Sequence, residues 1–222
     1  EPDLTTKVFG TKIDMPIFLS PTAMQSLYHP DGDKASALAA EKFGTIYSMS
    51  TMASFSIEEI SNLSKGPKIF QLYIHKDKSI TDDLIDRCKV TNFNGMCITV
   101  DTIVAGNRER DHRTGFTTPP KFTLESLFSF AMRPHWVFNY FTNKKFELAN
   151  IKHKTDKGTN IAKSVMDYIN EQYDPAMNWK DAEYVVKKWD GPIALKGVMS
   201  VEDAKKAIDI GCTAIMISNH GG

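Results

Sequence analysis

Short apolar runs alternate with segments of helical period along this chain, and the alternation limits the folds that are open to it. Six runs are typical of buried strands: 16–20, 45–50, 69–74, 95–101, 192–198 and 212–220. Strands that alternate with helices and are joined by short connections form a parallel sheet. The pattern therefore predicts an α/β fold, either a doubly wound open sheet or an eight-stranded barrel.

Capping signals place the helices between these runs. Ser56 is followed three residues later by Glu59, which predicts a capping box. Asn178 and Ser200 each precede a segment of helical period, and Gly211 closes the last one. The helices are therefore expected where a parallel sheet needs its crossovers.

Polar residues at the ends of the strands favour the barrel. Almost every predicted strand ends in at least one of them: Thr22, Ser50, Gln71, Tyr73, Thr99, Asp101, Lys196, Ser218 and His220. A barrel gathers all its strand ends into one mouth, whereas an open sheet binds its ligand at one switch point. Neither GxGxxG nor GxxxxGK[ST] occurs to support the open sheet. We predict a (β/α)8 TIM barrel and, because six strands cannot close it, a fragment of one.

Composition narrows the classes of partner. The 222 residues are 41% hydrophobic and carry a net charge of zero, which fits one globular domain over 1–222 and gives no electrostatic case for nucleic acid. Three separate cysteines, without CxxC spacing, indicate buried thiols and neither a disulfide framework nor a metal site. The sequence shows neither a signal-peptide pattern nor an apolar stretch of roughly 20 residues.

One connection is much longer than the others. About ninety residues separate Asp101 from Pro192, where a βαβ unit takes roughly thirty, so we predict a functional insertion at about 110–178. Its part at 122–146 mixes eight aromatic residues with Arg133, Lys144 and Lys145. Such a segment suits contact with a membrane interface, but packing over the barrel or against a neighbouring subunit explains it equally well.

His220 and Asp101 end two different strands and form the candidate catalytic pair. A carboxylate beside an imidazole fixes its tautomer and stabilises the imidazolium that forms when it accepts a proton. Such a base contributes roughly 10² to 10⁴ in rate, which is too little for a difficult C–H cleavage, so a cofactor is expected. Lys196 stands in an apolar strand, where burial of an unpaired ammonium is costly. An anionic reduced flavin or a salt bridge to a carboxylate would compensate its charge, and a lysine that forms a Schiff base is the third alternative.

Five segments, in this order, resemble the FMN-dependent α-hydroxy-acid dehydrogenases and oxidases. They are Pro21-Thr22-Ala23-Met24, Phe70-Gln71-Leu72-Tyr73, Thr99-Val100-Asp101-Thr102, Leu195-Lys196-Gly197 and Ser218-Asn219-His220-Gly221-Gly222. The family includes L-lactate dehydrogenases, flavocytochrome b2, glycolate oxidase and mandelate dehydrogenase, and its fold is an FMN-bearing (β/α)8 barrel. The long insertion looks most like that of the bacterial respiratory L-lactate dehydrogenases.

The resemblance implies roles for individual residues. The residues that it places at the cofactor FMN are Pro21, Thr22, Ala23, Ser50, Gln71, Thr99, Lys196 and Ser218. Lys196 would stabilise the reduced, anionic flavin. Tyr73 and Arg108 would bind the substrate, His220 would take a proton from it, and Asp101 would pair with His220. The resemblance also implies that an arginine and two further strands, which hold the FMN phosphate, follow Gly222.

The resemblance further implies oxidation of an L-2-hydroxy acid to the 2-oxo acid. Ala23, Met24 and Met52 would set the substrate size, and they favour L-lactate. Electrons would pass from FMN to a quinone or cytochrome, in a cytoplasmic homo-oligomer peripherally attached to the inner membrane. An oxidase that uses oxygen is the alternative enzyme, and a non-catalytic fragment of the barrel is the alternative from another class.

Overall fold

The computed structural model describes all residues except 1, 103–108, 115–122, 144–146, 152–171 and 221–222. Within the described part, five parallel strands form one sheet in the order β3-β4-β5-β6-β7. They are β3 (Tyr47–Ser50), β4 (Lys68–Leu72), β5 (Gly95–Thr99), β6 (Ile193–Lys196) and β7 (Ala214–Met216). Each crossover moves one strand along in the same direction. This order is that of a barrel wall, because a doubly wound sheet reverses direction at a switch point.

The predicted strand over 16–20 is wrong in extent. Only Leu19 pairs there, through a parallel bridge with Tyr47. The Leu19 amide donates to the Ile46 carbonyl at 3.0 Å, and the Ser48 amide donates to the Leu19 carbonyl at 3.2 Å. Pro16 has no N–H group to donate, which limits how far a ladder can extend. The segment therefore lies in the expected place beside β3 without forming a strand.

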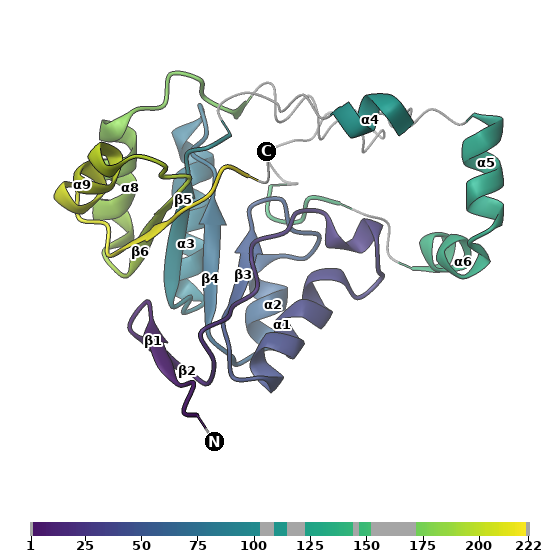
Figure 1. Cartoon of the computed structure of the whole chain (residues 1–222), viewed down its shortest axis with the longest axis horizontal. Helices are drawn as coiled ribbons and strands as arrows, with labels where there is room; N and C mark the ends of the chain where they lie inside the picture. Colours follow the sequence, from purple (N-terminus) through teal and green to yellow (C-terminus); the bar gives the residue numbers. More distant parts are fainter. Residues whose placement is uncertain (1, 103–108, 115–122, 144–146, 152–171, 221–222) are drawn as a thin grey trace.

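Five helices cover the outer face of the sheet (Figure 1). They are α1 (Gly32–Lys42), α2 (Ile57–Leu63), α3 (Lys78–Val90), α8 (Trp179–Trp189) and α9 (Val201–Asp209). The predicted caps are confirmed: Ser56 and Glu59 form a capping box, and Asn178 and Ser200 accept hydrogen bonds from the first turns that follow them. Gly211 takes φ +97° just after α9. The main core lies between these helices and the sheet, and the three cysteines are free and buried, as predicted.

An N-terminal hairpin closes the amino end of the sheet. β1 (Thr6–Val8) pairs antiparallel with β2 (Thr11–Ile13) through a turn at Phe9 and Gly10, both with positive φ. The ring of Phe9 packs so tightly on β5 that a Cβ on Gly95 would lie 2.9 Å from it. Figure 1 shows this hairpin at the opposite end of the sheet from the C-terminus. The carboxyl ends of the strands are therefore the end left for a site.

The long connection between β5 and β6 contains α4 (Glu109–Thr114), α5 (Leu124–Ala131) and α6 (Pro134–Thr142). Figure 1 shows α5 and α6 projecting away from the sheet and its helices. In the part of the chain that the structure describes, no helix has the length and apolar character to cross a membrane. We call α5 and α6 the aromatic hairpin.

A short segment at 147–151 attaches the connection to the body of the molecule. Asn150 and Ile151 are fully buried. The Asn150 side-chain oxygen accepts a hydrogen bond of 2.9 Å from the amide of Ile57, the first residue of α2. The Asn150 carbonyl accepts another, also of 2.9 Å, from the guanidinium of Arg87, which pairs with Glu58 at 2.7 Å. We call 147–151 the anchor segment.

Candidate active site

A ladder of polar side chains crosses the sheet at the carboxyl ends of its strands. The Ser50 hydroxyl donates to the Gln71 side-chain oxygen at 3.2 Å, and the Gln71 amide nitrogen donates to the Thr99 hydroxyl at 2.8 Å. Ser50 is paired with Gln71 in the register of β3 and β4, and Thr99 with Lys196 in that of β5 and β6. All four predicted cofactor residues on these strands are therefore adjacent.

Lys196 joins this ladder to a second group of polar side chains. Its Nζ lies 3.2 Å from Oδ2 of Asp101, 3.0 Å from the hydroxyl of Ser218 and 3.3 Å from Nδ1 of His220. The same Nδ1 lies 2.8 Å from Oδ1 of Asp101. Because these residues come from the ends of β5, β6 and β7, the parallel sheet brings together side chains that are up to 119 positions apart. We call Asp101, Lys196, Ser218 and His220 the proton-transfer cluster.

The tautomer of His220 follows from its shortest contact. Burial opposes ionisation of Asp101, but hydrogen bonds from the other members of the proton-transfer cluster keep its pKa below the ordinary value. The carboxylate is then an acceptor only, so Nδ1 of His220 must carry the proton that it shares with Asp101. The ammonium protons of Lys196 go to Asp101 and Ser218. Nε2 of His220 is therefore left with a lone pair that can accept a proton.

His220 is held in a strained backbone conformation. Its φ is +61°, in the left-handed region that a residue with a side chain seldom adopts. Its amide donates to the Ser218 hydroxyl at 3.0 Å, and its side chain remains 36% exposed. A strained backbone of this kind costs on the order of 1–3 kcal/mol and is typical of functional sites.

Gly197 lets Asp101 approach the strand that carries Lys196. A Cβ at Gly197 would lie 2.6 Å from Cβ of Asp101 and 2.8 Å from its amide nitrogen. Gly197 also has φ +105°, which residues with a side chain avoid. The proton-transfer cluster therefore depends on the absence of a side chain at Gly197.

Tyr73 directly follows β4, at the carboxyl end of the sheet, and burial raises the pKa of its hydroxyl. Three contacts of the site, two of them with Tyr73, were not predicted from the sequence. The Tyr73 amide donates to the Thr51 hydroxyl at 3.2 Å, the Tyr173 ring lies 4.8 Å from the Tyr73 ring, and the Thr102 hydroxyl lies 2.9 Å from Nδ1 of His220. Thr51 and Thr102 are each adjacent in sequence to a predicted site residue, whereas no local signal marks Tyr173.

The loop that contains Pro21, Thr22 and Ala23 lies beside the end of β3. The Met24 amide donates to the Met52 carbonyl at 3.0 Å, and Met24 has φ +56°. The loop therefore borders the polar ladder, as its predicted cofactor role requires. The remaining predicted site residue, Arg108, lies outside the described residues.

The donor set suits the pyrimidine edge of a flavin. A flavin presents two carbonyls and ring nitrogens there, which are matched by the two hydroxyls of Ser50 and Thr99, the amide of Gln71 and the ammonium of Lys196. The Lys196 side chain is only 11% exposed and forms an ion pair with Asp101 at 3.2 Å, which is the salt-bridge alternative considered from the sequence. The ammonium has a third N–H that can still be donated to a flavin. The residues present therefore fit FMN.

Comparison with known proteins identifies the family. A family model described as FMN-dependent dehydrogenase matches residues 1–222. The chain belongs to this family. FMN is therefore its cofactor, and its parallel sheet forms part of a (β/α)8 barrel, as predicted.

Two curated relatives are equally similar to the chain. Glycolate oxidase 1 of Zea mays is 35% identical over 219 residues, which are 99% of this chain and 53% of that enzyme. The L-lactate dehydrogenase of Vibrio parahaemolyticus is 34% identical over 220 residues, which are 99% of this chain and 58% of that enzyme. The chain thus spans about half the length of the curated relatives it matches. The two sequence identities are too similar to distinguish an oxidase from a dehydrogenase.

The solved structures give the same family. The structure of a monotopic membrane protein, (S)-mandelate dehydrogenase, superposes with a TM-score of 0.91 at 28% identity and covers 99% of this chain and 58% of its own. A mandelate oxidase with (S)-4-hydroxymandelic acid gives a TM-score of 0.76 at 33% identity, over 99% of this chain and 55% of its own. The structural comparison therefore agrees with the family match.

Proposed function

We propose that this chain is part of an enzyme that oxidises L-lactate to pyruvate through FMN and passes the electrons to a quinone or cytochrome. The observation that supports the reaction is the proton-transfer cluster, in which Asp101 fixes His220 with Nε2 available as a base. The range 1–222 would be one FMN hydroxy-acid dehydrogenase domain with the insertion at 110–178. A homo-oligomer remains a prediction.

Each residue of the site would have its own role in the proposed reaction. FMN, when bound, accepts the two electrons that the acid loses. Nε2 of His220 would take a proton from the α-carbon or the hydroxyl of the acid, and the Asp101 carboxylate would stabilise the imidazolium so formed. Tyr73 and Arg108 would orient the acid, and Lys196 would face the pyrimidine edge of the cofactor.

A small acid is supported by the side chains around Tyr73. Met52 is buried beside the Pro21–Met24 loop, and Ala23 packs against the core. The methyl group of lactate needs little room beside these side chains, whereas the ring of an aromatic 2-hydroxy acid would need a wider space. The similarity to an L-lactate dehydrogenase supports lactate as the first substrate to test.

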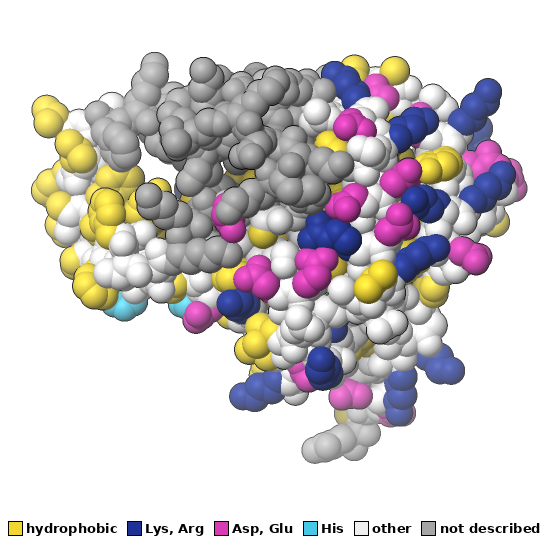
Figure 2. Space-filling view, turned by 180° about the vertical axis from the view of Figure 1, so that it is seen from behind, with side chains coloured by type: hydrophobic (Ala, Val, Ile, Leu, Met, Phe, Trp, Pro, Cys, Tyr) yellow, Lys and Arg dark blue, Asp and Glu magenta, His cyan; other side chains and the backbone are white. Residues whose placement is uncertain are grey.

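The aromatic hairpin supports an acceptor that is reached at a membrane. Phe128, Phe138 and Phe141 are exposed, and Figure 2 shows hydrophobic side chains gathered over this projecting part of the molecule. Helices in a membrane interface present an apolar face to the lipid, and α5 and α6 expose aromatic side chains that can do so. The structure of (S)-mandelate dehydrogenase, described as a monotopic membrane protein, supports a lipid surface as the partner. Exposed phenylalanines with Arg133 beside them would then insert among anionic lipids.

Anaerobic flavin reduction tests the reaction. The full-length, FMN-loaded protein is mixed with L-lactate without oxygen while the absorbance of the oxidised flavin is followed. Rapid bleaching is expected. If FMN is bound and neither lactate, glycolate nor a longer 2-hydroxy acid bleaches it, the proposal fails in favour of a non-catalytic barrel.

The acceptor is tested by reoxidation of the reduced protein. A quinone analogue or cytochrome should restore the oxidised absorbance much faster than air-saturated buffer does. If oxygen reoxidises the protein as fast as the quinone, the protein is an oxidase and the proposed acceptor is wrong.

Vesicle binding tests the hairpin. Deletion of 122–146 should release the full-length protein from anionic phospholipid vesicles and leave flavin reduction by lactate largely intact. Continued sedimentation of the deleted form with vesicles would refute docking through this segment.

A further inference from the structure

The chain returns from the long connection directly onto the continuation of β4. The Lys76 amide donates to the Gln172 carbonyl at 2.9 Å, and Tyr173 forms an antiparallel bridge with His75. His75 is two residues beyond Tyr73. Backbone pairing therefore fixes the position of Tyr173 beside the substrate end of β4.

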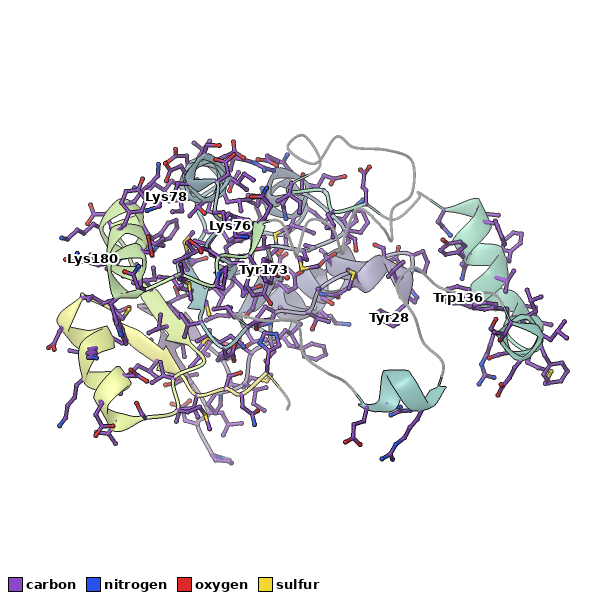
Figure 3. The ribbon with its side chains drawn as sticks, turned by 90° about the horizontal axis from the view of Figure 1, so that it is seen from above. Tyr28, Lys76, Lys78, Trp136, Tyr173 and Lys180 are labelled. Carbon is purple, nitrogen blue, oxygen red and sulfur yellow. The ribbon has the colours of Figure 1, made fainter. Side chains whose placement is uncertain are left out.

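The side chain of Tyr173 contacts two side chains of the site. Its ring centroid lies 4.8 Å from that of Tyr73, with the planes inclined by 33°. Its hydroxyl donates to the sulfur of Met52 at 3.4 Å. Figure 3 shows Tyr173 in the middle of the molecule, on the same side as Lys76 and far from Trp136 in the aromatic hairpin. Tyr173 therefore belongs to the site although it comes from the insertion.

Both contacts restrict side chains that would otherwise move. Methionine is unbranched and has three rotatable bonds, so Met52 can fill its space in several ways. A hydroxyl bonded to its sulfur favours one of them. The tilted ring of Tyr173 also limits the rotation of Tyr73, whose hydroxyl is expected to bind the acid.

We propose that Tyr173 is a positioning residue that fixes Met52 and Tyr73 and thereby limits the substrate to 2-hydroxy acids with a short side chain. The inference rests on the proposed function for the identity of the substrate. Tyr173 itself would touch neither the reacting atoms nor the cofactor. It would act on the space beside them, because a released Met52 would leave room for additional methylene groups.

The test compares Tyr173→Ala and Tyr173→Phe in the full-length, FMN-loaded protein. Flavin reduction is measured with L-lactate and with L-2-hydroxyhexanoate. In Tyr173→Ala, kcat/KM for the longer acid relative to lactate should rise by about tenfold. KM for lactate should rise, whereas kcat should fall by less than about threefold. Tyr173→Phe keeps the ring contact with Tyr73 but removes the hydroxyl from the Met52 sulfur, so it should restore KM for lactate and only part of the preference.

A matched control separates this effect from a general disturbance. Tyr184 on α8 is 42% exposed and donates its hydroxyl to Asp82 on the outside of the barrel. Tyr184→Ala should change neither the preference nor KM. An unchanged preference in Tyr173→Ala, with FMN bound and Tm as in the native protein, would overturn the proposal.

A second measurement does not need turnover. Oxidation of Met52 by hydrogen peroxide, followed by mass spectrometry, should be several times faster in Tyr173→Ala than in the native protein, because the sulfur loses its hydroxyl partner and its cover. If no 2-hydroxy acid reduces the flavin, the proposed function fails. The rate of Met52 oxidation then still tests whether Tyr173 holds Met52. An unchanged oxidation rate would show that Tyr173 does not hold Met52.

Discussion

The proton-transfer cluster and the aromatic hairpin are attached to the molecule in opposite ways. Asp101, Lys196 and His220 come from three strand ends, and their polar atoms lie within 3.3 Å of one another. The hairpin is held mainly by itself, through stacking of Trp136 on Phe130 at 5.5 Å and on Tyr140 at 5.2 Å. The cluster depends on the sheet for its geometry, whereas the hairpin leaves apolar side chains such as Phe128 and Phe141 exposed.

Two contacts show where the hairpin ends and the body begins. The Trp136 indole N–H donates to the Leu27 carbonyl at 3.0 Å, and Figure 3 shows Trp136 facing the segment that carries Tyr28. The anchor segment at 147–151 is buried against α2, so it belongs to the body. The connection thus combines an exposed part with parts that support the site.

Replacement of the base should have the largest effect. His220→Ala removes the proposed base, and flavin reduction should fall by about 10³-fold. FMN should still bind, because the polar ladder is unchanged. Stopped-flow absorbance under anaerobic conditions measures both. Undiminished flavin reduction would contradict the assignment of His220 as the base.

Acid should lower the unfolding free energy of the protein through His75, which is buried near the site. Burial lowers the pKa of His75 from its ordinary value of 6.5 to about 4. Between these values the unfolded chain binds more protons, so the stability from neutral His75 is complete above about pH 6.5 and is lost as the pH falls toward 4. The loss should reach about 3 kcal/mol.

Urea unfolding of the full-length protein at pH 7 and pH 4.5 measures this loss. His75→Gln should be less dependent on pH than the native protein over this range. His135→Gln, in the exposed α6, is the control and should keep the native dependence. If the unfolding free energies of His75→Gln and of the native protein fall equally between pH 7 and pH 4.5, His75 is not the source of the acid sensitivity.

The anchor segment should show an intermediate effect. Asn150→Ala leaves the buried amide of Ile57 without its acceptor, which should cost about 2 kcal/mol of unfolding free energy. Asn143→Ala at the end of α6 removes an exposed hydrogen bond and should change stability by less than about 0.5 kcal/mol. Thermal unfolding of both variants gives the difference. Equal effects would mean that the anchor segment is no more part of the body than the hairpin is.

The exposed side chains of the hairpin should matter least for folding. Phe141→Ser should change the unfolding free energy by about 0.5 kcal/mol or less, because the ring is 79% exposed. It should nevertheless weaken binding to anionic vesicles. Phe43→Ser, at the end of α1, removes a ring that is 58% exposed and serves as the control, with native binding expected. Equal losses of binding in both variants would argue against a role specific to the hairpin.

The strands were predictable where the sequence concentrates apolar residues. Tyr47–Ser50 and Lys68–Leu72 lie within about two residues of the predicted runs, because both are buried and their pattern is unbroken. The hairpin of β1 and β2 was not predicted, because its strands have three residues each and lack a long alternation. Its turn, Phe9-Gly10, is a weaker signal than Asn-Gly.

The site was predictable where a residue ends a strand. Asp101, Lys196 and His220 were recognised because each is a polar residue at the end of an apolar run, and the parallel sheet then brings such ends together. Tyr173 was not recognised, because its contact with Tyr73 depends on where a long connection returns. Loop closure of that length leaves no periodic pattern in the sequence.

The close approach of Asp101 to Gly197 has a consequence for how this site can evolve. A side chain at Gly197 would push Asp101 away, so Asp101 can keep its contact with Lys196 only while position 197 is glycine. Random mutagenesis screened for activity should find Gly197 as intolerant as the base itself, although it donates and accepts no proton. A ranking of positions by mutational tolerance would then count this glycine among the catalytic residues for a purely steric reason.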